Sequence, residues 1–306
     1  MIPDPRIKEP NIVSATEQRN PRTYDIDRVP TRDAVDLILA EDAAAVAAAQ
    51  AAADRLALAV ECAAVVLANE GRIHYFGAGA SGRLAVLDAT ELRPTFGIAR
   101  SAVQAHFPGG VEALVDSSLD FEDAFALGRT DADVLRDVDL AFGITASGST
   151  AYVAGALERA AEVGAARVLL TCNPGAAIEA DIVVVADTGP EALTGSTRLK
   201  AGTATKVLLN AFSTALMVSR GRTYSNLMVG MTVSNVKLRR RAAALLSDAS
   251  GADAVAIDEA LAASSDRVDV ALVSLRTGLS AEQASRLLEL SGGSLRDAIA
   301  RGCLPT

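Results

Sequence analysis

Aromatic side chains are scarce in this sequence. Tryptophan is absent, and aromatic residues make up only 4% of the 306 positions, although half of the residues are hydrophobic. The core must therefore be built mainly from Ala, Val and Leu, and we expect closely packed, Ala-rich helices. The chain is long enough for one large α/β domain with helical extensions, or for two domains of ordinary size.

Cysteine and histidine are also few. Cys62, Cys172 and Cys303 are odd in number and far apart, which favours reduced thiols over a framework of disulfides. Only His74 and His106 could join them as metal ligands, and no spacing typical of a zinc site is present. We therefore expect no metal site.

An excess of positive charge is lacking as well, since the formal net charge is −9 at pH 7. Nucleic acids and anionic membranes require a basic surface, so neither is an expected partner. A small anion remains a candidate ligand, because helix N-termini and a few local cations can bind phosphate. The longest apolar stretch, residues 43–68, is interrupted by charged residues and predicts a helix rather than a membrane span. No signal peptide precedes it, so we expect a cytoplasmic protein.

The sequence suggests three domains. The first, residues 1–59, starts with a polar, proline-punctuated arm, followed by a helix that Thr31 caps and that runs through Leu39. An Ala-rich segment, residues 42–69, then has high helix propensity throughout. These patterns predict N-terminal helices that precede the main domain.

The second domain, residues 60–222, shows strand signals. Short apolar runs end in Gly or hydroxyl residues and alternate with helical stretches; they are residues 72–79, 101–110, 138–148, 166–175 and 180–189. This alternation predicts a parallel sheet with helices on both faces, which is a three-layer α/β domain.

The third domain, residues 223–306, lacks strand signals and predicts a small helical bundle. Ser280 and Gln283 have the spacing of a capping box, which marks the start of a helix. Gly292 and Gly293 separate the last two helices that the periodicity predicts.

A glycine pattern follows the first expected strand. Residues 77–82 read GAGASG and match G-x-G-x-x-G, which is typical of dinucleotide sites. Such a site also needs an acidic residue at the end of the second strand to bind the ribose hydroxyls. That strand ends in QAHFP, residues 104–108, which contains no acid. We therefore exclude a dinucleotide.

A second loop of related chemistry follows the third expected strand. Residues 143–150 read GITASGST and place four hydroxyl side chains around one glycine before a helix. Each hydroxyl alone would be expected to cap that helix. Two such loops on one parallel sheet favour a phosphorylated small molecule at the carboxyl ends of the strands. The candidate ligand-binding residues are Gly79, Ala80, Ser81, Gly82, Thr145, Ser147, Gly148, Ser149 and Thr150.

These stretches resemble a known family. TASGST (145–150) is similar to the phosphate loop of sugar isomerase (SIS) domains. TEQRNPRTYDIDR (16–28), GAGASGRLAVLDATELRPTFG (77–97), TCNPG (171–175) and LTGSTRLKAGTATKVLLNAFSTALM (193–217) resemble, in order, the signature stretches of N-acetylmuramic acid 6-phosphate etherases. The resemblance implies an SIS fold and a small UBA-like C-terminal domain. The related glucokinase regulatory protein shares part of the pattern but contains two such sugar-binding domains.

The resemblance also implies a reaction. The family removes D-lactate from C3 of N-acetylmuramate 6-phosphate and adds water, as a carbon–oxygen lyase of cell-wall sugar recycling. Ring opening acidifies the C2 proton, so two carboxylates in different environments can serve as base and acid without a metal or an organic cofactor. By resemblance, Glu91 is the proton donor and Glu122 the second catalytic glutamate; without it, both are ordinary acids. A homodimer with sites across the subunit interface is also implied.

Other candidate residues are less specific. Arg198, Lys200 and Lys206 could bind phosphate or the lactyl carboxylate, or could equally lie on a helix surface. His106 at a strand end is more typical of a structural residue, and Asn173 of a turn.

The chain also departs from the family pattern at the ligand loops. Ala80 stands in place of Thr, Arg93 follows Leu92 in place of a Cys-Pro pair, Phe121 replaces a small residue and Ser149 replaces Arg. These changes could alter which sugar fits. Two other functions stay open: isomerisation of a hexosamine phosphate, and sugar-phosphate sensing without catalysis. The resemblance outside the SIS domain favours the lyase.

Overall fold

The computed structural model describes residues 15–231, 233 and 235–303, so the first fourteen residues of the expected arm lie outside it. The chain forms two compact units. The first comprises residues 1–89 and 101–212, and the second comprises residues 90–100 and 213–306. The N-terminal helices thus belong to the same unit as the sheet. The division into three functional domains stays a prediction.

A sheet of five parallel strands forms the centre of the first unit, in the order β2-β1-β3-β4-β5. The strands are β1 (Ile73–Gly77), β2 (Val103–His106), β3 (Leu140–Thr145), β4 (Ala166–Thr171) and β5 (Ile182–Val185). Each lies within one of the five apolar runs, so the predicted parallel sheet is confirmed. Because strands of a covered parallel sheet are buried on both faces, they appear as continuous apolar runs.

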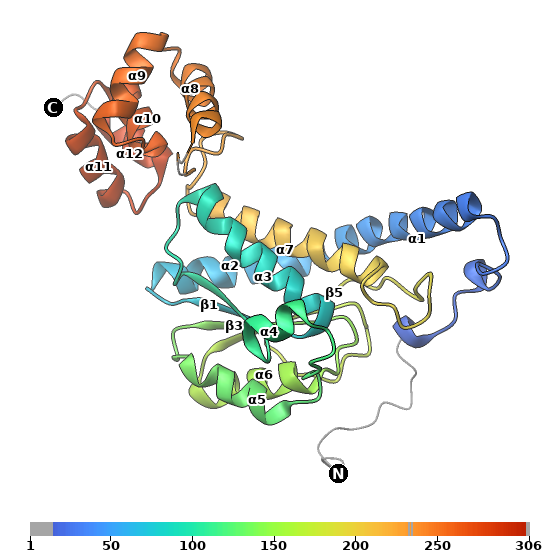
Figure 1. Cartoon of the computed structure of the whole chain (residues 1–306). Coiled ribbons are helices and arrows are strands. Elements are labelled where there is room, and N and C mark those ends of the chain that lie inside the picture. Colours follow the sequence, from blue (N-terminus) through green and yellow to red (C-terminus); the bar gives the residue numbers. More distant parts are fainter. Residues whose placement is uncertain (1–14, 232, 234, 304–306) are drawn as a thin grey trace. The chain divides into compact units, whose positions relative to one another are not determined.

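Helices cover both faces of this sheet (Figure 1). The helices α5 (Phe125–Asp131) and α6 (Ala151–Val163) lie on one face, and α2 (Ala53–Ala68) and α3 (Gly79–Phe96) lie on the other. Successive side chains of a strand point to opposite faces of the sheet and pack against different helix layers. Phe76 packs with Tyr152 of α6, whereas Tyr75 meets Phe142 edge-on at 5.5 Å between ring centroids on the opposite face. The predicted three-layer architecture is therefore confirmed.

The N-terminal helices differ in detail from the prediction. Thr31 is the first residue of α1 (Thr31–Ala51) rather than its cap, and the residue at the cap position is Pro30. The helix continues past Leu39 and ends where a short break at Ala52 separates it from α2. Alanine favours helix at every position of this segment, so the sequence carries no stop signal that marks the boundary.

The N-terminal arm is anchored to a distant loop. It forms two short 3-10 helices, Ala15–Glu17 and Pro21–Thr23. The Thr23 hydroxyl donates to the carbonyl oxygen of Ala192 at 2.8 Å, and the backbone N–H of Gly195 donates to the carbonyl oxygen of Thr16 at 3.1 Å. Both threonines are buried, so the arm is irregular but forms part of the first unit.

The C-terminal part of the second unit is a helical bundle, as predicted. Its helices are α8 (Val236–Ser250), α9 (Ala254–Ala263), α10 (Val268–Thr277), α11 (Ala281–Leu290) and α12 (Leu295–Gly302). Small and branched apolar side chains, including Leu246, Leu261 and Ala298, are fully buried between them. The Ser280 capping box is present in both directions. Gly292 and Gly293 separate α11 from α12.

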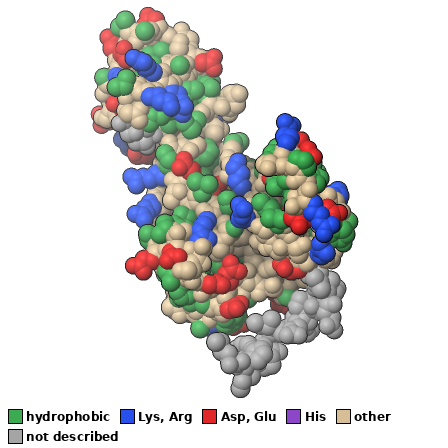
Figure 2. Space-filling view, turned by 45° about the vertical axis from the view of Figure 1, so that its right-hand side comes forward, with side chains coloured by type: hydrophobic (Ala, Val, Ile, Leu, Met, Phe, Trp, Pro, Cys, Tyr) green, Lys and Arg blue, Asp and Glu red, His purple; other side chains and the backbone are tan. Residues whose placement is uncertain are grey.

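Charged side chains of both signs are interspersed over the face shown in Figure 2. Small groups of Lys and Arg side chains there lie among Asp and Glu side chains. This agrees with a sequence in which 38 acidic residues outnumber 29 Lys and Arg residues. Among the described residues, no helix combines the length and the apolar character that crossing a membrane requires.

Candidate active site

The glycines of the first loop allow α3 to start directly against β1. Residues 79–82 form the first turn of α3 rather than an open loop, and Gly79 has a φ of +53°. A Cβ at Gly82 would overlap the carbonyl oxygen of Gly77, so only glycine permits this approach. The N–H groups at the start of a helix lack acceptors within it, although that of Gly82 already donates to the carbonyl oxygen of Ala78 at 2.9 Å. They provide donors for an anion at the edge of the sheet.

The second loop is ordered by hydrogen bonds among its hydroxyls. Thr145 Oγ1 lies 2.8 Å from Thr150 Oγ1 and 3.2 Å from Ser147 Oγ. It also accepts from the backbone N–H of Gly148 at 3.3 Å. The Ser149 hydroxyl donates to Ser147 Oγ at 3.1 Å. Thr145 is buried, so the network has a fixed base and an exposed upper side.

These hydroxyls do not act as caps of the following helix. Thr150 occupies the N-cap position of α6, yet its side chain makes no capping hydrogen bond within the described residues. Its hydroxyl bonds to Thr145 instead. Capping therefore does not explain the cluster, and the positive end of the α6 dipole stays directed at the loop.

Asn173 holds the second loop from the neighbouring strand. Its side-chain amide donates to the carbonyl oxygen of Ser147 at 2.7 Å, and its side-chain oxygen accepts from the backbone N–H of Gly175 at 3.0 Å. The expected turn role is thus confirmed and is joined by a positioning role. Gly148 has a φ of +73°, and a Cβ there would overlap Ala176. Both contacts fix the loop before any ligand binds.

Glu122 connects the two loops. Its carbonyl oxygen accepts from the backbone N–H of Tyr152 in the first turn of α6 at 3.0 Å. Its carboxylate lies against Gly79, where Oε1 occupies the space that a Cβ of residue 79 would need. The strands that lead into the loops are neighbours, since Gly77 pairs with Ile144. The backbone of Glu122 is thus bound at one loop and its carboxylate lies at the other.

A cavity of about 160 Å³ lies beside this carboxylate, wholly within the first unit. Its walls include Gly79, Arg83, Phe107, Phe121 and Glu122. The ring of Phe121 covers Gly109, where a Cβ would overlap the ring. The departure from a small residue at position 121 therefore places an aromatic ring in the wall of the cavity.

The surroundings of Glu122 make its carboxyl group more basic. Glu122 is exposed as a whole residue, but partial desolvation of its carboxyl group is the main reason that its pKa is raised above 4.5. The negative charges of Asp120 and Asp123 add to the effect, while Arg83 opposes it. A higher pKa brings a carboxylate closer to the basicity that proton abstraction near neutral pH requires. The two neighbouring acids, which from sequence alone resemble a solvated patch, thus tune Glu122.

Arg83 is a candidate that the sequence analysis missed. Its guanidinium donates to the carbonyl oxygens of Leu114 at 2.8 Å and Ala113 at 3.0 Å, and it lies 5.2 Å from the centre of the Phe107 ring. These contacts hold a cation in the wall of the cavity near Glu122. Its position one residue after the glycine pattern, directly after the first turn of α3, is a signal that could have found it.

Glu91 is the other expected catalytic residue. It is on an exposed part of α3, twelve residues after Gly79, in a segment that belongs to the second unit. The residues that line the cavity beside Glu122 do not include it. Arg93, the departure from the family pattern, is exposed on the same segment.

The three candidate cations are in different environments. Lys200 is buried with 1% of its surface exposed, and its ammonium group binds Glu41 at 2.7 Å. Arg22 also binds Glu41. The two cations lower the pKa of Glu41 to about 2, and Arg22 is the larger cause. Lys200 therefore has a structural partner, whereas Arg198 and Lys206 are exposed.

The two histidines form a pair of their own. His74 Nδ1 lies 2.9 Å from His106 Nε2, and both rings stack with Phe76. Burial lowers the pKa of His74 to about 4 and also lowers that of His106. Burial thus favours the neutral form of both rings, in keeping with the structural role expected for His106. Among the described residues, no group of three or more His, Cys, Asp or Glu could hold a metal ion.

Comparisons with known proteins show which family the chain resembles. Residues 55–161 match the model of the glucokinase regulatory protein N-terminal SIS domain. The N-acetylmuramic acid 6-phosphate etherase of Thermobifida fusca (strain YX) is 53% identical over 265 residues, which are 86% of this chain and 87% of that protein. The etherase of Erwinia tasmaniensis is 43% identical over 288 residues, 93% and 94% of the two chains. The solved structure of a phosphoheptose isomerase from Francisella tularensis has a TM-score of 0.47 and 17% identity, covering 62% of this chain and all of that one.

Proposed function

The chain belongs to the N-acetylmuramic acid 6-phosphate etherase family, and from this membership we propose that it converts N-acetylmuramate 6-phosphate and water to N-acetylglucosamine 6-phosphate and D-lactate. The reaction would make the protein a carbon–oxygen lyase of peptidoglycan recycling. The structural observation that carries the proposal is the position of Glu122, which connects a glycine turn and a hydroxyl loop at one edge of the sheet.

The phosphate would bind where the two loops meet. Dipoles of α3 and α6 and the N–H groups of their first turns favour a dianion there. Ser81 at the start of α3, with the ordered hydroxyls of Ser147, Ser149 and Thr150, can donate to its oxygens. Arg83 supplies a nearby positive charge for the phosphate or for the lactyl carboxylate.

The chemistry would proceed through the open-chain aldehyde. Glu122 removes the proton from C2, and the electron pair forms the C2–C3 double bond as the C3–O bond to the lactyl group breaks. Glu91 protonates the departing oxygen, so this oxygen leaves as the hydroxyl group of lactate rather than as an alkoxide. Water then adds its oxygen to C3 and a proton returns to C2. Two carboxylates suffice for this sequence, and no step requires a metal or an organic cofactor.

A homodimer would complete the site. The cavity beside Glu122 is smaller than the roughly 300–1,000 Å³ of ordinary small-molecule sites, and Glu91 is not among the residues that line it. Val35, Leu39 and Val46 expose apolar side chains along α1, as a helix covered by a second copy would. A cytoplasmic location is supported by Cys62, Cys172 and Cys303, which are all free thiols.

The test is the product. Purified protein incubated with N-acetylmuramate 6-phosphate should release one D-lactate for each N-acetylglucosamine 6-phosphate formed. Conversion to a ketose phosphate without lactate would instead favour an isomerase. Saturable binding of the substrate without any product would favour a sugar-phosphate sensor.

A further inference from the structure

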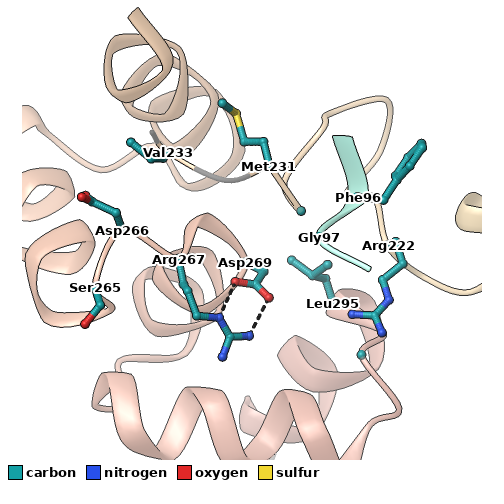
Figure 3. A pocket seen from close by; sticks show the side chains of 12 residues that line it. Phe96, Gly97, Arg222, Met231, Val233, Ser265, Asp266, Arg267, Asp269 and Leu295 are labelled. Atoms are coloured by element: carbon teal, nitrogen blue, oxygen red, sulfur yellow. Dashed lines mark hydrogen bonds and ion pairs between the residues drawn. The ribbon is translucent and has the colours of Figure 1, made fainter. Parts of the chain in front are cut away.

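A second cavity, of about 260 Å³, lies wholly within the second unit (Figure 3). Its walls come from the end of α3, the segments that follow α7 (Lys200–Ser219) and precede α8, and the turns before α10 and α12. None of its lining residues belongs to the proposed sugar-phosphate site. The cavity is therefore formed by other residues than those of the site proposed above.

Arg222 is the unusual residue of this cavity. Its guanidinium has no hydrogen-bond or ion-pair partner among the described residues, although the side chain is half-buried. It lies over Gly293, where a Cβ would come within 2.7 Å of Cζ. Gly293 has a φ of +83°, which favours glycine there. A side chain at position 293 would also displace the guanidinium from its present position.

The guanidinium of Arg222 also lacks full compensation of its charge. Burial lowers its pKa, the carboxylate of Asp269 opposes this, and Arg220 and Arg267 lower it further. Asp269 is itself engaged, since it accepts from Arg267 Nη2 at 2.8 Å and from the backbone N–H of Val270 at 2.8 Å. A partly desolvated cation without its own counterion costs free energy that a bound anion would recover.

The turn before α10 adds further features that favour a ligand. Arg267 is the N-cap residue of this ten-residue helix, whose positive dipole end lies at the cavity. Ser265 and Asp266, just before it, both have positive φ angles, +54° and +61°. Consecutive left-handed residues other than glycine are strained, and such strain clusters at binding sites. Figure 3 shows Arg267 and Asp269 side by side in the wall.

We propose that this cavity binds a small oxyanion, a phosphate or carboxylate group of a compact metabolite, through the guanidinium of Arg222. Of the charged side chains in the wall, Arg267 pairs with Asp269, and Asp266 pairs with Arg239 outside the lining, which leaves Arg222 without an ion-pair partner in the described part of the chain. A guanidinium presents parallel N–H donors that match the oxygens of either group. Phe96, Met231 and Leu295 in the wall would contact the carbon skeleton of the ligand. This site would add ligand binding to the second unit, independent of the proposed etherase reaction.

The test follows the Arg222 side chain directly. The full-length protein, labelled with 15N-arginine, is titrated separately with inorganic phosphate and with D-lactate at constant ionic strength. The side-chain Nε–H signal of Arg222 is identified by its loss in Arg222→Lys. We expect this signal to shift saturably with at least one probe, and the responding probe identifies the source of the oxyanion. An Arg222 signal that neither probe moves would overturn the proposal.

Variants separate this site from the sugar-phosphate loops. In the variants, anion binding is followed through the amide signals of residues around the cavity. Arg222→Ala should weaken this binding at least about tenfold, because a charge-assisted hydrogen bond is lost. Arg222→Lys keeps the charge without the fork and should have an intermediate effect, which tests the site even where Arg222→Ala unfolds. Arg286→Ala, at an exposed arginine of α11, should leave the affinity unchanged. Equal affinities in all variants would show that the anion binds elsewhere.

Discussion

The backbone N–H of Tyr152 donates to the carbonyl oxygen of Glu122 over 3.0 Å, and this bond attaches a catalytic candidate to the first turn of α6. The same helix follows the hydroxyl loop at residues 145–150. In the proposed reaction, this bond would link phosphate binding at the loop to the position of Glu122.

Replacing Glu122 tests its role as the base. Glu122→Gln keeps the size of the side chain but cannot accept a proton, so kcat for lactate release should fall roughly 10²–10⁴-fold with KM little changed. Asp123→Asn is the matched control, because it removes the adjacent exposed carboxylate and should keep kcat within a few-fold. Equal losses in the two variants would show that general charge, not Glu122, matters.

The pH dependence of kcat/KM should show the effect of the carboxylates next to Glu122. Asp120 and Asp123 raise the pKa of Glu122, so removing one negative charge must lower it. In Asp123→Asn, the acid limb of the kcat/KM profile should therefore move to lower pH. If the limb moves to higher pH or stays in place, the group whose ionisation it reports is not Glu122.

Gly79 provides a test of the contact between the two loops. Gly79→Ala places a methyl group where Glu122 Oε1 lies and forces alanine to adopt a φ of +53°. Gly110→Ala imposes similar backbone strain, at a φ of +66°, with no atom within 4 Å of the new methyl group. Each should cost about 1–2 kcal/mol in the free energy of unfolding. Only Gly79→Ala should also abolish most lactate release; comparable activity in the two variants would contradict the contact.

Lys200 is expected to matter for stability. Lys200→Met removes one of the two cations that bind the buried carboxylate of Glu41, and should lower the free energy of unfolding by about 3 kcal/mol in denaturant titrations. Arg198→Met, at an exposed position two residues earlier, should change it by less than about 0.5 kcal/mol. A small effect of Lys200→Met would mean that the ion pair is dispensable.

Glu41 should contribute to acid unfolding. Its pKa is about 2 in the folded protein and 4.5 without these partners, so the stabilisation is complete above pH 4.5 and is lost as the pH falls towards 2. The stability difference between the wild type and Glu41→Gln should therefore shrink between pH 5 and pH 3. A constant difference over that range would contradict the assignment.

The sheet could be predicted from the sequence because its central strands β1 and β3 are buried on both faces. All five strands lie within short, mainly apolar runs whose last residue is glycine, so β1 to β5 were identifiable individually. The end of α1 was not, since alanine is equally favourable on both sides of the break at Ala52. Local propensity thus fixes the type of element more securely than its boundary.

The candidate site could be predicted only in part. The two loops carry local patterns of glycine and hydroxyl residues, whereas the partners of Lys200 and Glu122 are distant in sequence. Glu41 precedes Lys200 by 159 positions, and the contact between Glu122 and Gly79 depends on how two loops meet in space. Arg83 was missed because its cavity is formed by segments that are separate in sequence.

The central claim is that the reaction passes through removal of the C2 proton by a carboxylate open to solvent. Glu122 is exposed, so its proton should exchange with water before it returns to the sugar. The most direct measurement is the mass and NMR spectrum of N-acetylglucosamine 6-phosphate formed in heavy water. We expect one deuterium at C2 of the product, with D-lactate released in equal amount. Product formed at full rate with the original hydrogen at C2 would contradict elimination and water addition.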